Sequence, residues 1–173
     1  MNKKRRRFDP AYRSPMTMAY ARRMVGAVLL LGAISLFHQM YGHLHGYSKP
    51  LGAISGLTVL GAALLTVLPW RAYQLKGQRA GLYWIIFLSF SWWFLAIGMY
   101  DGLWNQILLR AANAVGLVSV SSSTPATGDI LFTLTGVAQF FFAMPVGVYT
   151  WMLVREESST RAPSESFRFM ELS

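Results

Sequence analysis

Four long stretches of this chain contain no Asp, Glu, Lys or Arg, and they restrict its fold more than any other feature. They cover residues 24–48, 50–70, 80–100 and 130–154, which are 25, 21, 21 and 25 residues long. A helix needs about 20 apolar residues to cross a hydrocarbon core about 30 Å thick. Because lipid offers no hydrogen-bond partner, the backbone groups of a crossing segment must be satisfied within a helix. The pattern therefore predicts an all-α polytopic membrane protein, built as a four-helix transmembrane bundle.

The predicted membrane domain occupies residues 24–154 of the 173-residue chain. Its four spans are expected at about residues 24–41, 51–70, 82–100 and 130–153. A basic tail of residues 1–23 precedes this domain, and a polar tail of residues 155–173 follows it. The four spans leave no room for a second soluble domain.

The segment of residues 101–129 is the only long connection between the predicted spans. Its apolar residues recur at steps of three and four, as on one face of a helix. Polar residues fall largely on the other side: Asn105, Gln106, Arg110 and Asn113. We therefore expect a short amphipathic helix that lies in the membrane surface on the outer face. The Ser, Thr, Pro and Gly residues that follow it are typical of a flexible loop.

The basic residues are divided unequally between the two sides that four crossings would create. Of the 16 Lys and Arg residues, 14 lie in the two tails or between the second and third spans. The positive-inside rule then places both termini in the cytoplasm, on the inner face of a bacterial-type inner membrane. The net charge of +9 is explained by this topological signal, so we expect no nucleic-acid partner.

Membrane lipids are one expected partner, because clustered cations beside a span are attracted to anionic headgroups. The residues predicted to bind headgroups are Lys3, Lys4, Arg5, Arg6 and Arg7.

Three histidines at the outer end of the first span are the candidate metal ligands: His38, His43 and His45. Imidazole nitrogens bind copper, zinc and haem iron. A haem held by two histidines usually draws them from two helices, however, and the nearest carboxylates, Asp101 and Asp129, are distant in sequence. The favoured interpretation is hydrogen bonding at the wet membrane interface, and no cofactor is expected.

No arrangement of residues points to an enzyme. The chain has no cysteines, and it contains no visible Ser/His/Asp set, carboxylate pair or phosphate-binding Gly-rich loop. The spans contain no ionisable residue apart from His38 near their edge, so proton-coupled transport is not expected either.

Small and aromatic residues in the spans suggest where helices meet. Gly52 and Gly56 have the spacing that lets two helix backbones approach closely. Packing of the second span against the first is the favoured interpretation of this pair, and contact with another protein or protomer is the alternative. Four further residues are candidates for contact with a partner: Trp92, Trp93, Gln139 and Pro145.

These features favour a non-enzymatic membrane subunit or accessory factor of a larger inner-membrane assembly, of the secretion, conjugation or respiratory kind. Its partners would be other membrane subunits or further copies of the chain. One alternative is a small oligomeric channel or transporter without proton coupling, lined by Gln39, Gln139 and the Ser and Thr residues of the spans. A second alternative is a metal or redox site at the outer face, built on the segment from His38 to His45.

Overall fold

The computed structural model describes residues 14–47, 51–117 and 129–170, with side chains within 14–47, 56–117 and 129–159. The helices are α1 (Pro15–Leu44), α2 (Leu51–Lys76), α3 (Arg79–Leu88), η1 (Ser89–Leu108), α4 (Leu109–Ala114) and α5 (Ile130–Met170). Within these ranges the protein is all-helical, and four helical stretches are long and apolar enough to cross a membrane. The four predicted spans lie on these stretches. Helix α5 continues beyond its span through most of the predicted C-terminal tail.

The ends of the helices follow from their local sequence. Pro15 occupies the first turn of α1, where its missing N–H removes no helical hydrogen bond. The hydroxyl of Ser14 caps this helix by accepting a hydrogen bond from the amide of Met16 at 3.3 Å. After α2, Gly77 adopts a φ of 67°, a left-handed conformation that glycine reaches without steric cost. The turn to α3 therefore needs only Gly77 and Gln78.

Elements α3, η1 and α4 form one continuous helical rod from Arg79 to Ala114. The residues at its junctions, Ser89 and Leu109, both have right-handed helical backbone angles. At the end of η1 the hydrogen bonding is of the π type, because the amide of Leu109 donates to the carbonyl of Trp104, five residues back. The structure thus corrects the expectation of a separate surface helix after the third span. The amphipathic segment continues the span itself.

The packing of η1 explains this difference. Its buried positions lie mostly four residues apart, with Ile97 and Gly98 adjacent: Ser89, Trp93, Ile97, Gly98, Gly102 and Gln106. This repeat is longer than the 3.6 residues of an α-helix, on which the sequence interpretation relied. As a result Gln106, predicted on the polar outer side, is buried against Gly136 of α5. The rod is held to α5 by this face as far as Gln106.

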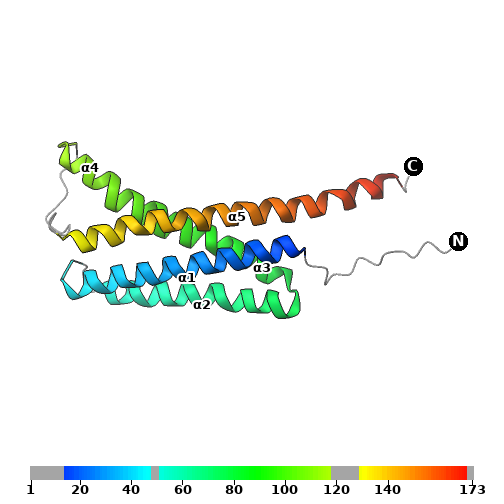
Figure 1. The fold of residues 1–173 in the computed structure, drawn as a ribbon, viewed down its shortest axis with the longest axis horizontal. Coiled ribbons are helices and arrows are strands. Elements are labelled where there is room, and N and C mark those ends of the chain that lie inside the picture. Colours follow the sequence, from blue (N-terminus) through cyan, green and yellow to red (C-terminus); the bar gives the residue numbers. More distant parts are fainter. Residues whose placement is uncertain (1–13, 48–50, 118–128, 171–173) are drawn as a thin grey trace.

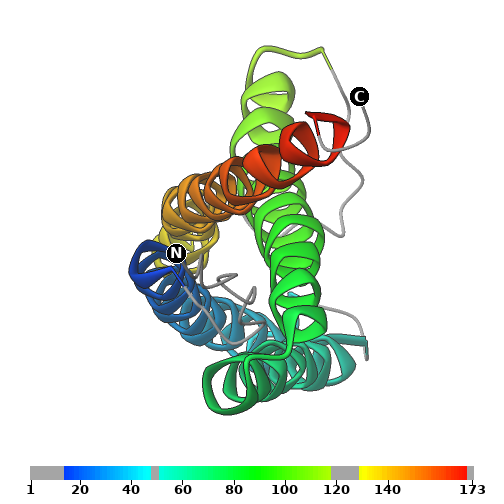
Figure 2. The ribbon, with the colours of Figure 1, turned by 90° about the vertical axis from the view of Figure 1, so that its right-hand side faces the viewer.

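The bundle consists of four helical rods: α1, α2, the continuous rod of α3, η1 and α4 (the third rod), and α5. They form a ring in which each rod packs against two neighbours. Helix α1 lies between α2 and α5, and the third rod closes the ring by packing against both α2 and α5 (Figure 2). Successive rods run in opposite directions, so the start of α1 and the α2–α3 turn lie at one end of the bundle (Figure 1). We call this the proximal end, and the end where α1 stops at Leu44 the distal end. Towards the distal end the third rod diverges from the other helices.

Two groups of buried residues fill the interior. The proximal group joins all four rods: Ala21, Met24, Val25, Trp70, Tyr73, Leu82, Ile85 and Leu153. The central group does the same: Val28, Leu31, Val59, Ala62, Trp93, Ile97, Ala143 and Val146. Towards the distal end, several of the contacts between helices are polar.

Candidate functional site

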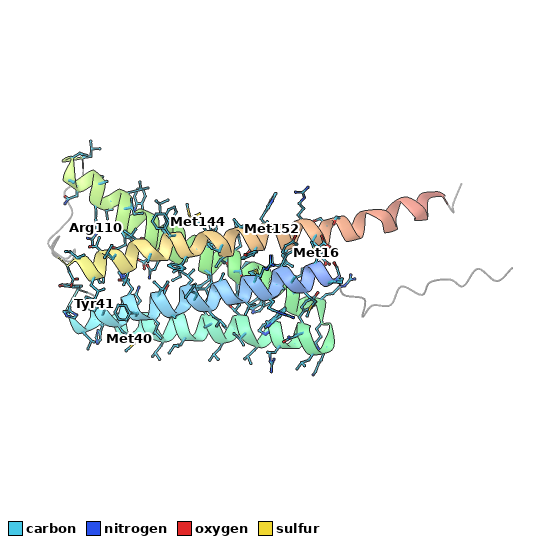
Figure 3. The ribbon with its side chains drawn as sticks, in the orientation of Figure 1. Met16, Met40, Tyr41, Arg110, Met144 and Met152 are labelled. Atoms are coloured by element: carbon cyan, nitrogen blue, oxygen red, sulfur yellow. The ribbon has the colours of Figure 1, made fainter. Side chains whose placement is uncertain are left out.

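Polar side chains from α1, the third rod and the start of α5 meet at the distal end, and we call them the distal cluster. Its members are His38, Gln39, Tyr41, Asp101, Asn105, Arg110, Asp129, Thr133 and Thr135. Figure 3 shows two of them at this end, Tyr41 on α1 and Arg110 on the third rod. The cluster is the largest concentration of polar contacts between helices among the described residues.

His38 lies at the inner edge of the cluster and is only 2% exposed. Its Nδ1 atom is 2.9 Å from the Thr135 hydroxyl oxygen, and its ring stacks on Phe132 at a centroid distance of 4.1 Å. The hydroxyl of Thr135 also donates to the carbonyl of Leu131 at 2.9 Å. His38 is thereby fixed as a link between α1 and α5.

Both carboxylates that appeared remote in sequence approach the end of α1. Asp101 accepts hydrogen bonds from Gln39 and Asn105, each at 3.4 Å. Asp129 accepts one from the hydroxyl of Tyr41 at 3.0 Å. It also caps α5, because its carboxylate accepts from the amide of Phe132 at 3.0 Å. The distal cluster therefore contains acidic groups beside the histidine segment, which sequence reasoning had placed far apart.

The capping contact has an electrostatic consequence. Donation from the Phe132 amide is the main cause that lowers the pKa of Asp129, and the hydroxyls of Tyr47 and Tyr41 act in the same direction. The hydrogen bond to Asp129 is in turn the main cause that raises the pKa of Tyr47. Near neutral pH the carboxylate is thus charged and both phenols are protonated. Hydrogen bonds from the two phenols to Asp129 then join the end of α1 to the start of α5.

Arg110 joins the diverging end of the third rod to α5. Its guanidinium donates to the hydroxyl of Thr133 at 2.6 Å. That hydroxyl donates to the carbonyl of Asp129 at 2.9 Å. The short chain of bonds attaches α4 to the first turn of α5 where direct helix packing has ended. Arg110 is the one basic residue described at the distal end.

The three histidines do not converge. His38 is buried against α5, whereas His43 and His45 are exposed at the end of α1. His45 stacks on Tyr41 at a centroid distance of 4.0 Å, and its Nδ1 lies 3.0 Å from the carbonyl oxygen of Tyr41. Within the described part of the chain, no three His, Cys, Asp or Glu residues are grouped as metal ligands.

The predicted partner contacts are distributed between the inside and the outside of the bundle. Trp93 is fully buried and its indole N–H donates to Thr66 at 3.0 Å, so it holds the third rod to α2 and offers no surface to a partner. Gln139 is fully buried as well, whereas Pro145 lies exposed on α5. Trp92 is partly buried, and its indole nitrogen has no hydrogen-bond partner among the described residues. The assignment of Trp93 and Gln139 to an external interface is therefore corrected.

Gln139 has an unusual environment. Neither its amide nitrogen nor its oxygen has a hydrogen-bond partner among the described residues, and the same holds for the hydroxyl of Ser35. Contacts between α1 and α5 pair Met24 with Thr150 and Gly42 with Phe132. This antiparallel register places Ser35 opposite Gln139. Two of the polar residues expected to line a channel, Ser35 and Gln139, are thus enclosed between two packed helices.

Close helix packing uses glycines that sequence reasoning did not single out. A Cβ atom on Gly102 would lie 2.6 Å from the backbone nitrogen of Phe140, and one on Gly98 would overlap Ala143. The Gly98-x-x-x-Gly102 spacing is the available signal, because it equals that of Gly52 and Gly56. A Cβ atom on Gly56 would lie 3.6 Å from the side chain of Leu36 on α1, which is an ordinary contact distance within the chain. Gly52 lies in the part of α2 whose side chains are outside the described set.

Two further predictions lie outside the described residues: the headgroup-binding segment from Lys3 to Arg7, and most of the flexible loop after residue 117. No family model matches the chain, and comparison with curated proteins and with solved structures finds no significant match to either.

Proposed function

We propose that this protein is a non-enzymatic integral membrane subunit or accessory factor, which binds another membrane protein through the third rod. The observation that carries the proposal is a set of exposed aromatic side chains on that rod: Tyr83, Trp84, Phe87, Phe90, Tyr100 and Trp104. Aromatic residues at the two membrane interfaces are common in any membrane protein. Phe87 and Phe90 lie between those levels, where a packing partner would cover them.

The closed interior supports this proposal over a channel formed within one chain. The central group of buried residues fills the space between the four rods, with Trp93 at its core. Two of the polar side chains that a pathway would need, Thr66 and Thr135, are instead used to join helices. A pathway between several copies of the chain is the alternative, and the experiment below separates the two.

The proposed setting is an inner membrane with both termini in the cytoplasm. The antiparallel arrangement puts the start of α1 and the end of the fourth span at the same end of the bundle. The described basic residues are also concentrated there, as the positive-inside rule requires of a cytoplasmic face. The proximal end would then be cytoplasmic and the distal cluster would face outwards.

A cross-linking experiment on the full chain tests the proposal. A photo-reactive amino acid replaces Phe90 on the third rod or, as a control, Leu64 on α2, since both side chains are about half exposed. We expect Phe90 to cross-link one protein of different sequence, which co-purifies stoichiometrically in mild detergent and is lost with Phe90→Ala. Leu64 should yield no such adduct. Adducts only with further copies of the chain would favour the oligomeric channel, and lipid adducts alone at both positions would contradict both functions.

A further inference from the structure

The proximal end carries a concentration of positive charge that the proposed function does not use. Six basic residues are exposed there, and we call them the basic collar: Arg22, Arg23, Arg71, Lys76, Arg79 and Arg155. They come from α1, α2, α3 and α5, so the collar draws on all four rods. The distal end, by contrast, has Arg110 alone among the described residues.

Half of the collar lies on the hairpin formed by α2 and α3. A Cβ atom on Gly81 would lie 2.6 Å from the carbonyl oxygen of Pro69, so α2 and α3 are in close backbone contact there. The two-residue connection at Gly77 then keeps Arg71, Lys76 and Arg79 on the same hairpin. Because the hairpin is anchored by the proximal group of buried residues, these three charges cannot separate freely.

The other half lies where α1 and α5 meet. The Ser14 hydroxyl donates to Glu156 at 2.9 Å, and Met24 contacts Thr150 deeper in the bundle. In the register that pairs Met24 with Thr150, Arg155 lies opposite Ala19, so Arg22 and Arg23 lie about one helical turn from it along the bundle. Charges from the first and last helices are thus brought together by helix packing.

Acidic residues neutralise only part of this charge. Two carboxylates are described at the proximal end, Glu156 and Glu157, against the six basic residues. Glu156 accepts a hydrogen bond from Ser14, and Glu157 accepts one from Tyr83 at 2.9 Å. Among the described residues the collar therefore retains a net positive charge, which can attract anions from outside the chain.

We propose that the basic collar binds the phosphate groups of anionic phospholipids in one leaflet. The collar borders directly on exposed apolar side chains, among them Leu68, Leu75 and Trp151. A phospholipid can place its phosphate on the arginines and its acyl chains along these residues, which a free phosphate ion cannot do. Clustered cations at a membrane surface are attracted to anionic lipid, and salt screens that attraction.

Thermal unfolding of the purified full chain in lipid nanodiscs tests this proposal. We expect the Tm to rise as phosphatidylglycerol replaces phosphatidylcholine, and the rise to shrink at high salt. The triple variant Arg71→Gln/Lys76→Gln/Arg79→Gln should lose at least half of the rise. Arg110→Gln, which removes the distal charge, should retain it. An equal rise in Tm for the triple variant and the wild type would overturn the proposal.

Two further measurements complete the test. Inorganic phosphate added to phosphatidylcholine nanodiscs should leave the Tm unchanged, and a rise equal to that with phosphatidylglycerol would assign the collar to soluble anions instead. If the triple variant does not fold, native mass spectrometry of the wild type in mixed lipid tests the proposal instead, by measuring which lipids the protein retains. Retention of phosphatidylglycerol over phosphatidylcholine supports the proposal, and equal retention refutes it. Neither result depends on the partner proposed for the third rod.

Discussion

Single glycines determine how closely the rods approach, and Gly102 provides the sharpest test. A Cβ atom there would lie 2.6 Å from the backbone nitrogen and 3.0 Å from the Cα of Phe140. Because backbone in a packed helix cannot move aside cheaply, Gly102→Ala should destabilise the bundle by about 1–3 kcal/mol. The matched control is Gly26→Ala, since no atom lies within 4 Å of the added methyl group. For Gly26→Ala, helix propensity predicts an increase in stability of up to about 1 kcal/mol. Unfolding in detergent with increasing denaturant measures both, and equal effects would contradict the observed packing.

The hydrogen bonds to Asp129 lead to a further prediction at the scale of single residues. Its pKa is lowered below the ordinary value of 3.8 by the Phe132 amide and the two tyrosine hydroxyls. A depressed pKa means that the charged form stabilises the fold. This stabilisation is fully present above about pH 3.8 and is lost as the pH falls through the lowered pKa. Asp129→Asn should therefore be less stable than the wild type at pH 7, and the difference should narrow below pH 3.8. A constant difference across this range would show that the charge on Asp129 does not contribute.

At the scale of elements, hydropathy was sufficient to locate the four helices that are long and apolar enough to span a membrane, because each leaves a long run without charge. It failed at the end of the third span. Asp101 interrupts the apolar run, yet Gly102 and Gln106 continue the contact with α5. This contact depends on the residues of α5 that face the third rod. The hydropathy pattern of a single segment carries no information about them. The π-type winding also changes which residues share a face, so Gln106 was assigned to the wrong side.

The continuity of this rod can be tested at Tyr100, a residue that is 63% exposed. Proline at the start of a separate surface helix would be tolerated, whereas proline within a continuous helix removes a hydrogen bond and costs about 3 kcal/mol or more. Tyr100→Pro should therefore strongly destabilise the protein, and Tyr100→Ala should have a small effect. Circular dichroism and thermal unfolding in detergent measure both variants. Similar stability of the two would support a separate helix after residue 100.

For the whole molecule, the alternation of four spans correctly implied that distant segments share an end of the bundle. It did not reveal which side chains meet there. His38 bonds Thr135 across 97 positions, and Tyr41 bonds Asp129 across 88. These pairings depend on how each helix is rotated about its axis, which the fit of glycines and aromatic rings decides. The histidine segment was therefore identified correctly as polar, but its carboxylate partners were not predicted.

The orientation of the whole bundle gives the last prediction. The basic collar lies at the proximal end and Arg110 at the distal end, and the side with more Lys and Arg is retained in the cytoplasm. A reporter fused after Gln78, in the α2–α3 turn, should therefore behave as cytoplasmic, and one fused after Gly46 as external. Neutralising Arg71, Lys76 and Arg79 together should weaken this preference without reversing it, because the basic residues of the N-terminal tail remain. Alkaline phosphatase and green fluorescent protein fusions report the two sides independently. Activity of alkaline phosphatase at Gln78 would mean that the bundle is inserted the other way, with the distal cluster in the cytoplasm.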